Sequence, residues 1–260
     1  MISSAFLVIE QSFFHAFSLF RDIPVSVHAW GGALAFLAAL VALGSAKGGL
    51  GHRRAGHYFV AGVALILISG VALWFRGLAN GTPGWLLAFL FLLAGSTLYA
   101  TASGLRSALD RRTWIPLVDP ALTLLASFTS TMAIIQFLLD LHRRTQFVDP
   151  AGEIALRPFV VIVLTALIAI VNAWFAYDDL RVRRLASLER LQRLSRHLQR
   201  MLIAVVAVFT AFFIVELSAR FFDRGYQLWP LYLGPGLLVS PLILIFMRRL
   251  NSLPETAPPH

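Results

Sequence analysis

The sequence contains no cysteine, which excludes disulfide bonds, iron–sulfur clusters, thiolate zinc sites and thioether-linked haem. Charged residues are also scarce. They make up 13% of the 260 residues, whereas a soluble domain averages about 25%. Hydrophobic residues account for 58% of the chain. A sequence this apolar and this poor in charge is typical of neither a soluble domain nor a disordered one.

Acidic residues are the scarcer of the two charge types. The chain has 13 Asp and Glu against 22 Lys and Arg, which gives a formal net charge of +9. In a soluble protein this excess would suggest a nucleic-acid partner. In an apolar chain it is better explained by the placement of loops on either side of a membrane. We therefore expect membrane lipids as partners and no nucleic acid.

Seven segments are long and apolar enough to cross a bilayer core, which takes about 20 helical residues. They are 25–44, 56–75, 84–105, 115–139, 158–177, 198–217 and 228–247. Continuous apolar runs indicate helices, because membrane strands alternate between apolar and polar residues. The sequence thus predicts an all-α fold, a polytopic transmembrane helical bundle of seven spans forming one domain over 25–250. Residues 1–24 are predicted as an N-terminal interfacial helix, with an eighth short span as the alternative, and 251–260 as a disordered tail.

Lys and Arg are distributed unevenly between alternate loops. One set of loops holds 15 of the 22 basic residues and the other set holds 7. The larger set includes Lys47, Arg53 and Arg54, and the seven arginines from Arg181 to Arg200. The positive-inside rule places the richer set in the cytoplasm. The N-terminus is then outside and the C-terminus cytoplasmic.

Two predicted span entries on the richer side combine histidine with arginine. The loop 47–57 reads KGGLGHRRAGH, and its glycines allow a tight turn. His197 and Arg200 are three residues apart at the start of span 198–217, so they share a helix face. Together these residues predict a basic ligand-binding site at the cytoplasmic face; an ordinary basic hairpin is the alternative reading of the loop. The predicted site comprises His52, Arg53, His57, His197 and Arg200.

The stretch 178–200 is amphipathic when drawn as one helix. Its leucines gather on one side, and most of its arginines gather on the other. Such a helix suits the membrane surface, with its arginines facing anionic headgroups. The alternative is a topology anchor that simply connects two spans.

Histidines occur near both predicted membrane surfaces, and this pattern keeps a haem b hypothesis open. Two neutral imidazoles can hold haem iron between helices. The candidate metal ligands are His28, His57, His142 and His197. Because these residues lie at span ends, ordinary interfacial histidines are the competing interpretation. No carboxylate–histidine motif for zinc or di-iron chemistry occurs in any predicted span.

Two carboxylates lie inside predicted spans, where ionisable groups are costly and suggest function. Asp119 precedes Pro120 and is expected either to cap a helix or to bind a proton or cation. Glu216 lies four residues before Arg220, a spacing that also permits an ion pair. Gly31, Ala35 and other small residues on the first span predict close helix packing.

Several segments together resemble a family of uncharacterised bacterial multi-span inner-membrane proteins. The resemblance rests on a His-Arg-x-x-Gly motif at His52 and a His-x-x-Arg-Met motif at His197. It is supported by His28-Ala-Trp-Gly-Gly and by Trp229-Pro. The resemblance implies a seven- or eight-helix protein of the bacterial inner membrane, and it implies no particular activity.

The leading functional hypothesis is an integral membrane protein that binds a small anionic or amphiphilic ligand at its basic site, for transport, sensing or assembly. One alternative is a haem b or quinone-linked electron-transfer protein. Another is an accessory subunit that packs against a larger membrane complex. No nucleophile–base pattern stands out, so whether the protein is an enzyme stays open.

Overall fold

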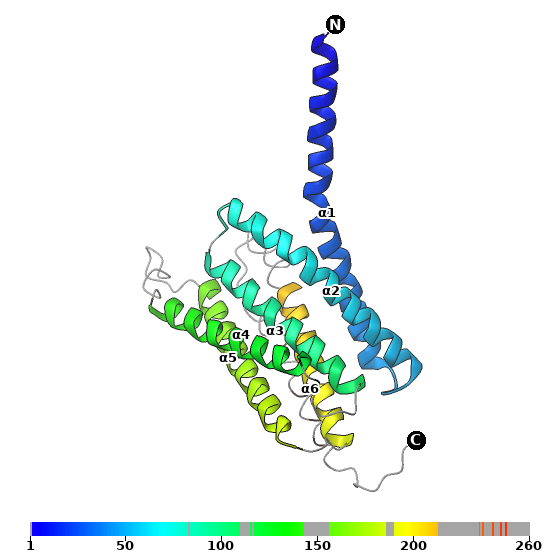
Figure 1. Ribbon diagram of the computed structural model, residues 1–260, viewed down its shortest axis with the longest axis vertical. Coiled ribbons are helices and arrows are strands. Elements are labelled where there is room, and N and C mark those ends of the chain that lie inside the picture. The colour runs from blue at the N-terminus through cyan, green and yellow to red at the C-terminus, as the bar shows by residue number, and fades with distance from the viewer. Residues whose placement is uncertain are drawn as a thin grey trace. The chain divides into compact units, whose positions relative to one another are not determined.

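The computed structural model describes residues 2–82, 84–109, 115, 117–142, 156–185 and 190–212, with a few single positions beyond. For residues 2–22 and 156–160 the description covers the backbone alone. The described residues form six α-helices and no strands (Figure 1). The all-α prediction is therefore confirmed for this part of the chain. The helices are α1 (Ile2–Gly44), α2 (Leu50–Ala79), α3 (Gly84–Leu109), α4 (Val118–His142), α5 (Leu156–Arg183) and α6 (Arg190–Phe212).

Five helices within the described ranges contain a segment long and apolar enough to cross a membrane. These segments are Ile23–Gly44, Leu50–Ala79, Gly84–Ala108, Val118–His142 and Val161–Arg183. The protein therefore has the helices of an integral membrane protein, but seven or eight spans are not confirmed. The described part of α6 is not among the five, since arginines occupy much of its first half. The last predicted span, 228–247, and the predicted tail lie outside the continuously described ranges.

The N-terminal helix is longer than its sequence pattern suggested. The segment predicted as an interfacial helix and the first predicted span form one continuous helix, α1, which contains Pro24. A proline removes one backbone hydrogen bond but does not have to end a helix. The backbone is therefore helical across the predicted boundary at residue 24.

The chain divides into two compact units, Met1–Thr82 and Pro83–His260. In unit 1, α1 and α2 pack through small residues. A Cβ atom on Gly62 would lie 2.7 Å from the Ala35 nitrogen, and one on Gly31 would lie 2.8 Å from the Leu65 Cβ. Glycine at both positions lets the two backbones approach closely, as predicted for the first span.

In unit 2, α3 packs against α4, α5 and α6, and α4 also packs against α5. Gly104 of α3 makes room for α6, because a Cβ atom there would lie 2.9 Å from the Met201 Sδ. Halfway along the helices, Asn172 Nδ2 donates to Ser96 Oγ at 2.9 Å, and Ser130 Oγ donates to the Ala169 carbonyl at 2.9 Å. These bonds tie α5 to α3 and α4. The apolar core consists of Phe89, Leu92, Leu93, Ala133, Val161, Ile168, Ala169 and Ala207.

Candidate functional site: a buried arginine–aspartate cluster

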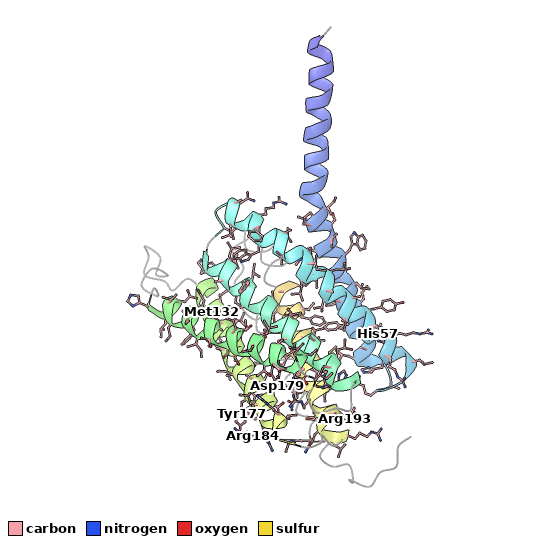
Figure 2. All side chains as sticks on the ribbon, in the orientation of Figure 1. His57, Met132, Tyr177, Asp179, Arg184 and Arg193 are labelled. Atoms are coloured by element: carbon pink, nitrogen blue, oxygen red, sulfur yellow. The ribbon has the colours of Figure 1, made fainter. Side chains whose placement is uncertain are left out.

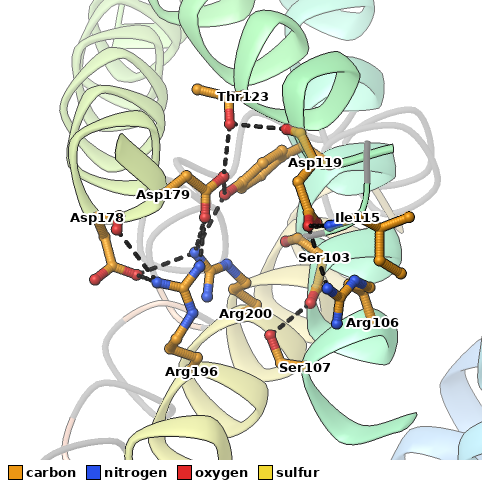
Figure 3. Close-up of polar contacts among 11 residues, drawn as sticks. Ser103, Arg106, Ser107, Ile115, Asp119, Thr123, Asp178, Asp179, Arg196 and Arg200 are labelled. Atoms are coloured by element: carbon orange, nitrogen blue, oxygen red, sulfur yellow. Dashed lines mark hydrogen bonds and ion pairs between the residues drawn. The ribbon is translucent and has the colours of Figure 1, made fainter. Parts of the chain in front are cut away.

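Four charged side chains meet where the C-terminal end of α5 lies beside the first turns of α6 (Figure 3). Arg200 Nη2 lies 2.6 Å from Asp179 Oδ1 and 3.1 Å from Asp178 Oδ2. The two guanidinium nitrogens of Arg196 lie 2.5 Å from Asp178 Oδ2 and 2.5 Å from Asp179 Oδ1. Each arginine therefore contacts both carboxylates. We call these four residues the ion cluster.

Residues of α3 and α4 complete the surroundings of the ion cluster. The Tyr99 hydroxyl donates to Asp179 Oδ2 at 2.6 Å and accepts from Arg200 Nη2 at 3.3 Å. Thr123 Oγ1 lies 3.5 Å from the same carboxylate oxygen. The Arg200 guanidinium carbon lies 5.3 Å from the Phe175 ring centroid and 5.9 Å from that of Tyr99, within range of a cation–π interaction. All four helices of unit 2 thus contribute to the cluster.

The ion cluster is buried at Arg200 and Asp179, half-buried at Arg196 and Asp178, and carries no net formal charge. The Arg200 side chain is 1% exposed, that of Asp179 is 10% exposed, and that of Asp178 is 22% exposed. Burial and the nearby charge of Arg200 lower the pKa of Arg196, while the two aspartates oppose this shift. Two positive and two negative groups at these distances neutralise one another, which offsets part of the penalty of removing them from water.

A second ion pair joins the same ends of α3 and α4. Arg106 Nη2 lies 3.1 Å from Asp119 Oδ2, and this oxygen also accepts a hydrogen bond from the Ile115 backbone at 2.5 Å. Asp119 therefore lies in the first turn of α4, as expected. Its carboxylate binds Arg106 and the backbone nitrogen of Ile115, which precedes the helix. Glu216, the other predicted intramembrane carboxylate, lies outside the described residues.

The predicted site residues of unit 2, His197 and Arg200, lie close together, but neither presents its charge to the surface in the way the prediction supposed. His197 Nδ1 lies 2.9 Å from the Gly104 carbonyl. A carbonyl can only accept, so Nδ1 carries the proton in this bond. Arg200 is neutralised by the aspartates. Both residues join α6 to neighbouring helices.

The predicted site residues of unit 1, His52, Arg53 and His57, lie in the first turns of α2, and Lys47 lies in the loop before this helix. His52 Nδ1 lies 3.0 Å from the Ala42 carbonyl, and Arg53 Nε donates to the Gly48 carbonyl at 2.8 Å. Lys47 Nζ donates to the Ala42 and Leu43 carbonyls at 2.9 and 2.8 Å. These side chains satisfy carbonyl groups at the end of α1 and in the loop. His57 is exposed on α2 (Figure 2).

The remaining candidate metal ligands, His28 and His142, form no recognisable metal site within the described residues. His28 Nδ1 lies 3.1 Å from Ser69 Oγ within unit 1, and His142 is an exposed residue at the end of α4. Among the described residues, no group of three or more histidines and carboxylates could hold a metal ion. The haem b hypothesis therefore gains no support from these positions and stays a prediction.

Several arginines near the ion cluster take no part in it. Arg181, Arg184 and Arg190 are exposed, and Arg193 is half-buried. None of these four arginines forms an ion pair with another residue of the described chain. Figure 2 shows Arg184 and Arg193 at the same end of unit 2 as Asp179. The described carboxylates at this end, Asp178 and Asp179, are engaged by the inner arginines, so among the described residues the outer arginines leave a positive surface.

Sequence reasoning missed Asp178, Asp179, Tyr99 and Arg196. It also treated 178–200 as one helix, which is wrong: α5 ends at Arg183, a turn follows at Arg184, and α6 begins at Arg190. A usable signal was present. Two aspartates end one span, and two arginines spaced four apart begin the next, so a helical hairpin brings the opposite charges together.

No family model, curated protein or solved structure matches the chain.

Proposed function

We propose that this integral membrane protein binds a small anionic or amphiphilic ligand at the arginine-bearing end of unit 2. The observation that carries the proposal is the division of the arginines at this end. Arg196 and Arg200 form ion pairs with Asp178 and Asp179, whereas the outer arginines make no ion pair within the described chain. The outer set, which would contact the ligand, is Arg181, Arg184, Arg190 and Arg193.

In this proposal the ion cluster positions the site without touching the ligand. It joins the C-terminal part of α5 to the second and third turns of α6, and Tyr99 ties both to α3. The outer arginines emerge from the same two helix ends, so their spacing depends on this connection. Arg200, first considered as a ligand contact, becomes a positioning residue, and His197 acts with it through its bond to α3.

The proposal includes a sidedness. The positive-inside rule favours a cytoplasmic position for the outer arginines, in a bacterial inner membrane, with the N-terminus on the opposite side. Tryptic cleavage in sealed right-side-out and inverted vesicles tests this orientation. Cleavage after Arg184 is expected in inverted vesicles alone, and cleavage in right-side-out vesicles alone would reverse it.

The function is tested with decyl phosphate, an anionic amphiphile, titrated against the purified protein in a zwitterionic detergent. Binding is measured by calorimetry for the wild type, for Arg190→Gln/Arg193→Gln, and for Arg54→Gln, which removes an exposed arginine from unit 1. Each arginine near a phosphate contributes about 1 kcal/mol, so the double variant is expected to bind about 30-fold more weakly. Arg54→Gln should bind as the wild type does. Equal affinity of all three proteins would contradict the proposal.

A further inference from the structure

One outward face of α5 changes in character along its length. Leu167, Ile170, Trp174, Tyr177 and Arg181 follow one another at intervals of three or four residues, so they form a single stripe on the helix. The four apolar and aromatic members are 47%, 65%, 55% and 59% exposed, in that order, and Arg181 is exposed as well. Arg184 lies in the turn that follows α5 and is exposed as well.

The side-chain chemistry of the stripe changes along α5 in the same order as the chemistry of one lipid leaflet from its centre to its surface. Aliphatic side chains come first, and a pair of aromatic rings follows. The Trp174 and Tyr177 ring centroids are 5.9 Å apart. Arginines come last. Tryptophan and tyrosine prefer the boundary between acyl chains and headgroups, and arginines prefer the phosphates beyond it. The order therefore follows a phospholipid from its chain to its headgroup.

The length of the stripe also fits one lipid. From Ile170 to Arg183, where α5 ends, the helix advances about 20 Å at the rise of an α-helix, and Arg184 follows in the turn. One leaflet, including headgroups, measures about 20–22 Å, which is half of a bilayer. The arginines would thus lie at phosphate depth when Ile170 lies near the middle of the membrane.

The negative charges on α5 do not oppose an anionic headgroup. Asp178 and Asp179 are adjacent to Tyr177 in sequence, but they turn toward α6 and pair with Arg196 and Arg200. The opposite face of α5 is buried through Thr165, Asn172 and Asp179. Two chemically different faces therefore coexist on one helix. The inner face is neutralised, and the outer face keeps its positive charge.

We propose that the α5 stripe binds one anionic phospholipid, with the phosphodiester at Arg181 and Arg184 and an acyl chain along Tyr177, Trp174 and Ile170. This inference rests on the proposed function and names the class of its amphiphilic ligand. A free anion would use the arginines alone. A phospholipid uses the arginines and the apolar part of the stripe together.

The experiment measures quenching of tryptophan fluorescence by brominated lipids in nanodiscs. The full-length protein is reconstituted with rising fractions of dibromo-phosphatidylglycerol, or with dibromo-phosphatidylcholine at the same fractions. The emission that is lost in Trp174→Phe is assigned to Trp174. This emission is expected to be quenched at several-fold lower fractions of phosphatidylglycerol than of phosphatidylcholine. Arg181→Gln/Arg184→Gln should remove this preference, at about fivefold per arginine. Arg54→Gln should keep it.

Each result of this experiment decides the question. Equal quenching by both lipids in the wild type would overturn the lipid inference, as would an equal effect of Arg54→Gln, which would indicate diffuse attraction. Glycerol phosphate, a headgroup without a chain, is added as a competitor at concentrations far above those of the lipid. It is expected to leave the quenching unchanged, and full displacement would identify a free-anion site instead. If decyl phosphate still binds while the lipid preference is absent, the proposed function stands and only the lipid inference falls.

Discussion

The two basic regions of this protein look alike in sequence and differ in structure. Both place histidine and arginine at the entry to an apolar helix. In unit 1, Lys47 and His52 contact backbone carbonyls at the end of α1. In unit 2, Arg196 and Arg200 are buried against two aspartates. The same residue types therefore close a helix end in one unit and join four helices in the other.

The difference follows from where the carboxylates lie. The last turn of α1 contains no acidic residue, so the basic side chains of the following loop find carbonyl oxygens instead. The end of α5 carries Asp178 and Asp179, which offer full negative charges to Arg196 and Arg200 of α6. Contacts to exposed carbonyls contribute little to the free energy of unfolding, whereas breaking a buried ion pair lowers it strongly. The two regions should therefore respond very differently to mutation.

The largest effect is expected for Arg200→Leu. The substitution leaves two carboxylates facing one arginine in a buried site, and an uncompensated buried charge costs about 3–5 kcal/mol. We expect this loss in the free energy of unfolding, measured by titrating SDS into detergent micelles and following helix content. Arg53→Leu, in the first turn of α2 in unit 1, should lose far less. Adding Asp179→Leu to Arg200→Leu restores charge balance and should recover part of the loss. Similar losses for the two single variants would remove the distinction between the regions.

Gly62→Ala is expected to have the next largest effect. It tests whether close contact between the α1 and α2 backbones stabilises unit 1, as the ion cluster stabilises unit 2. Its new methyl group would lie 2.7 Å from the Ala35 nitrogen and 2.8 Å from the Gly31 carbonyl oxygen. Because these are backbone atoms, the helices must separate, at a cost of about 1–3 kcal/mol. Thermal unfolding in detergent measures the change. Gly70→Ala is the matched control on the same helix, since its nearest contact would be 3.8 Å from His28. An equal shift for both variants would contradict close packing at Gly62.

Tyr99→Phe removes the hydroxyl that joins α3 to the ion cluster and leaves the ring in place. The lost bond to the Asp179 carboxylate is expected to lower the free energy of unfolding by about 1–2 kcal/mol, since hydrogen bonds between membrane helices are weaker than their burial suggests. Tyr58→Phe changes an exposed tyrosine of unit 1 and should be nearly neutral. The same SDS titration serves both variants. No loss in Tyr99→Phe would show that the arginines alone hold Asp179.

The sequence was a good guide to the helices and a poor guide to their partners. Runs of apolar residues placed the ends of α2 to α5 to within six residues. One helix needs only its own sequence to satisfy its backbone in a membrane. The boundary at residue 24 was less certain, since a proline can lie inside a helix. Small residues such as Gly31 correctly indicated close packing. A residue without a side chain lets a neighbouring helix approach closely, whichever helix that neighbour is.

The ion cluster could be predicted only in part. The spacing of Arg200 from His197 marks it as a candidate, but its partners come from two other helices, α3 and α5. Tyr99 precedes it by 101 residues, and no local pattern links positions that far apart. Asp178 and Asp179 are closer in sequence, but the amphipathic pattern of 178–200 predicts that they begin a surface helix. Instead α5 ends at Arg183, and both aspartates pair with Arg196 and Arg200 of α6.

The smallest effect, and the sharpest test of the difference between the two regions, is expected for Lys47→Met. The side chain keeps its length and loses its donors to the Ala42 and Leu43 carbonyls. A cation at the C-terminal end of a helix contributes about 0.3–1 kcal/mol, and less when it is exposed and screened by salt. The unfolding free energy should therefore fall by no more than this amount, and the fall should shrink further in high salt. Arg200→Leu should keep its full loss in high salt because its partners are buried. A loss for Lys47→Met as large and as salt-insensitive as that of Arg200→Leu would mean that the basic loop of unit 1 is as essential to the fold as the ion cluster.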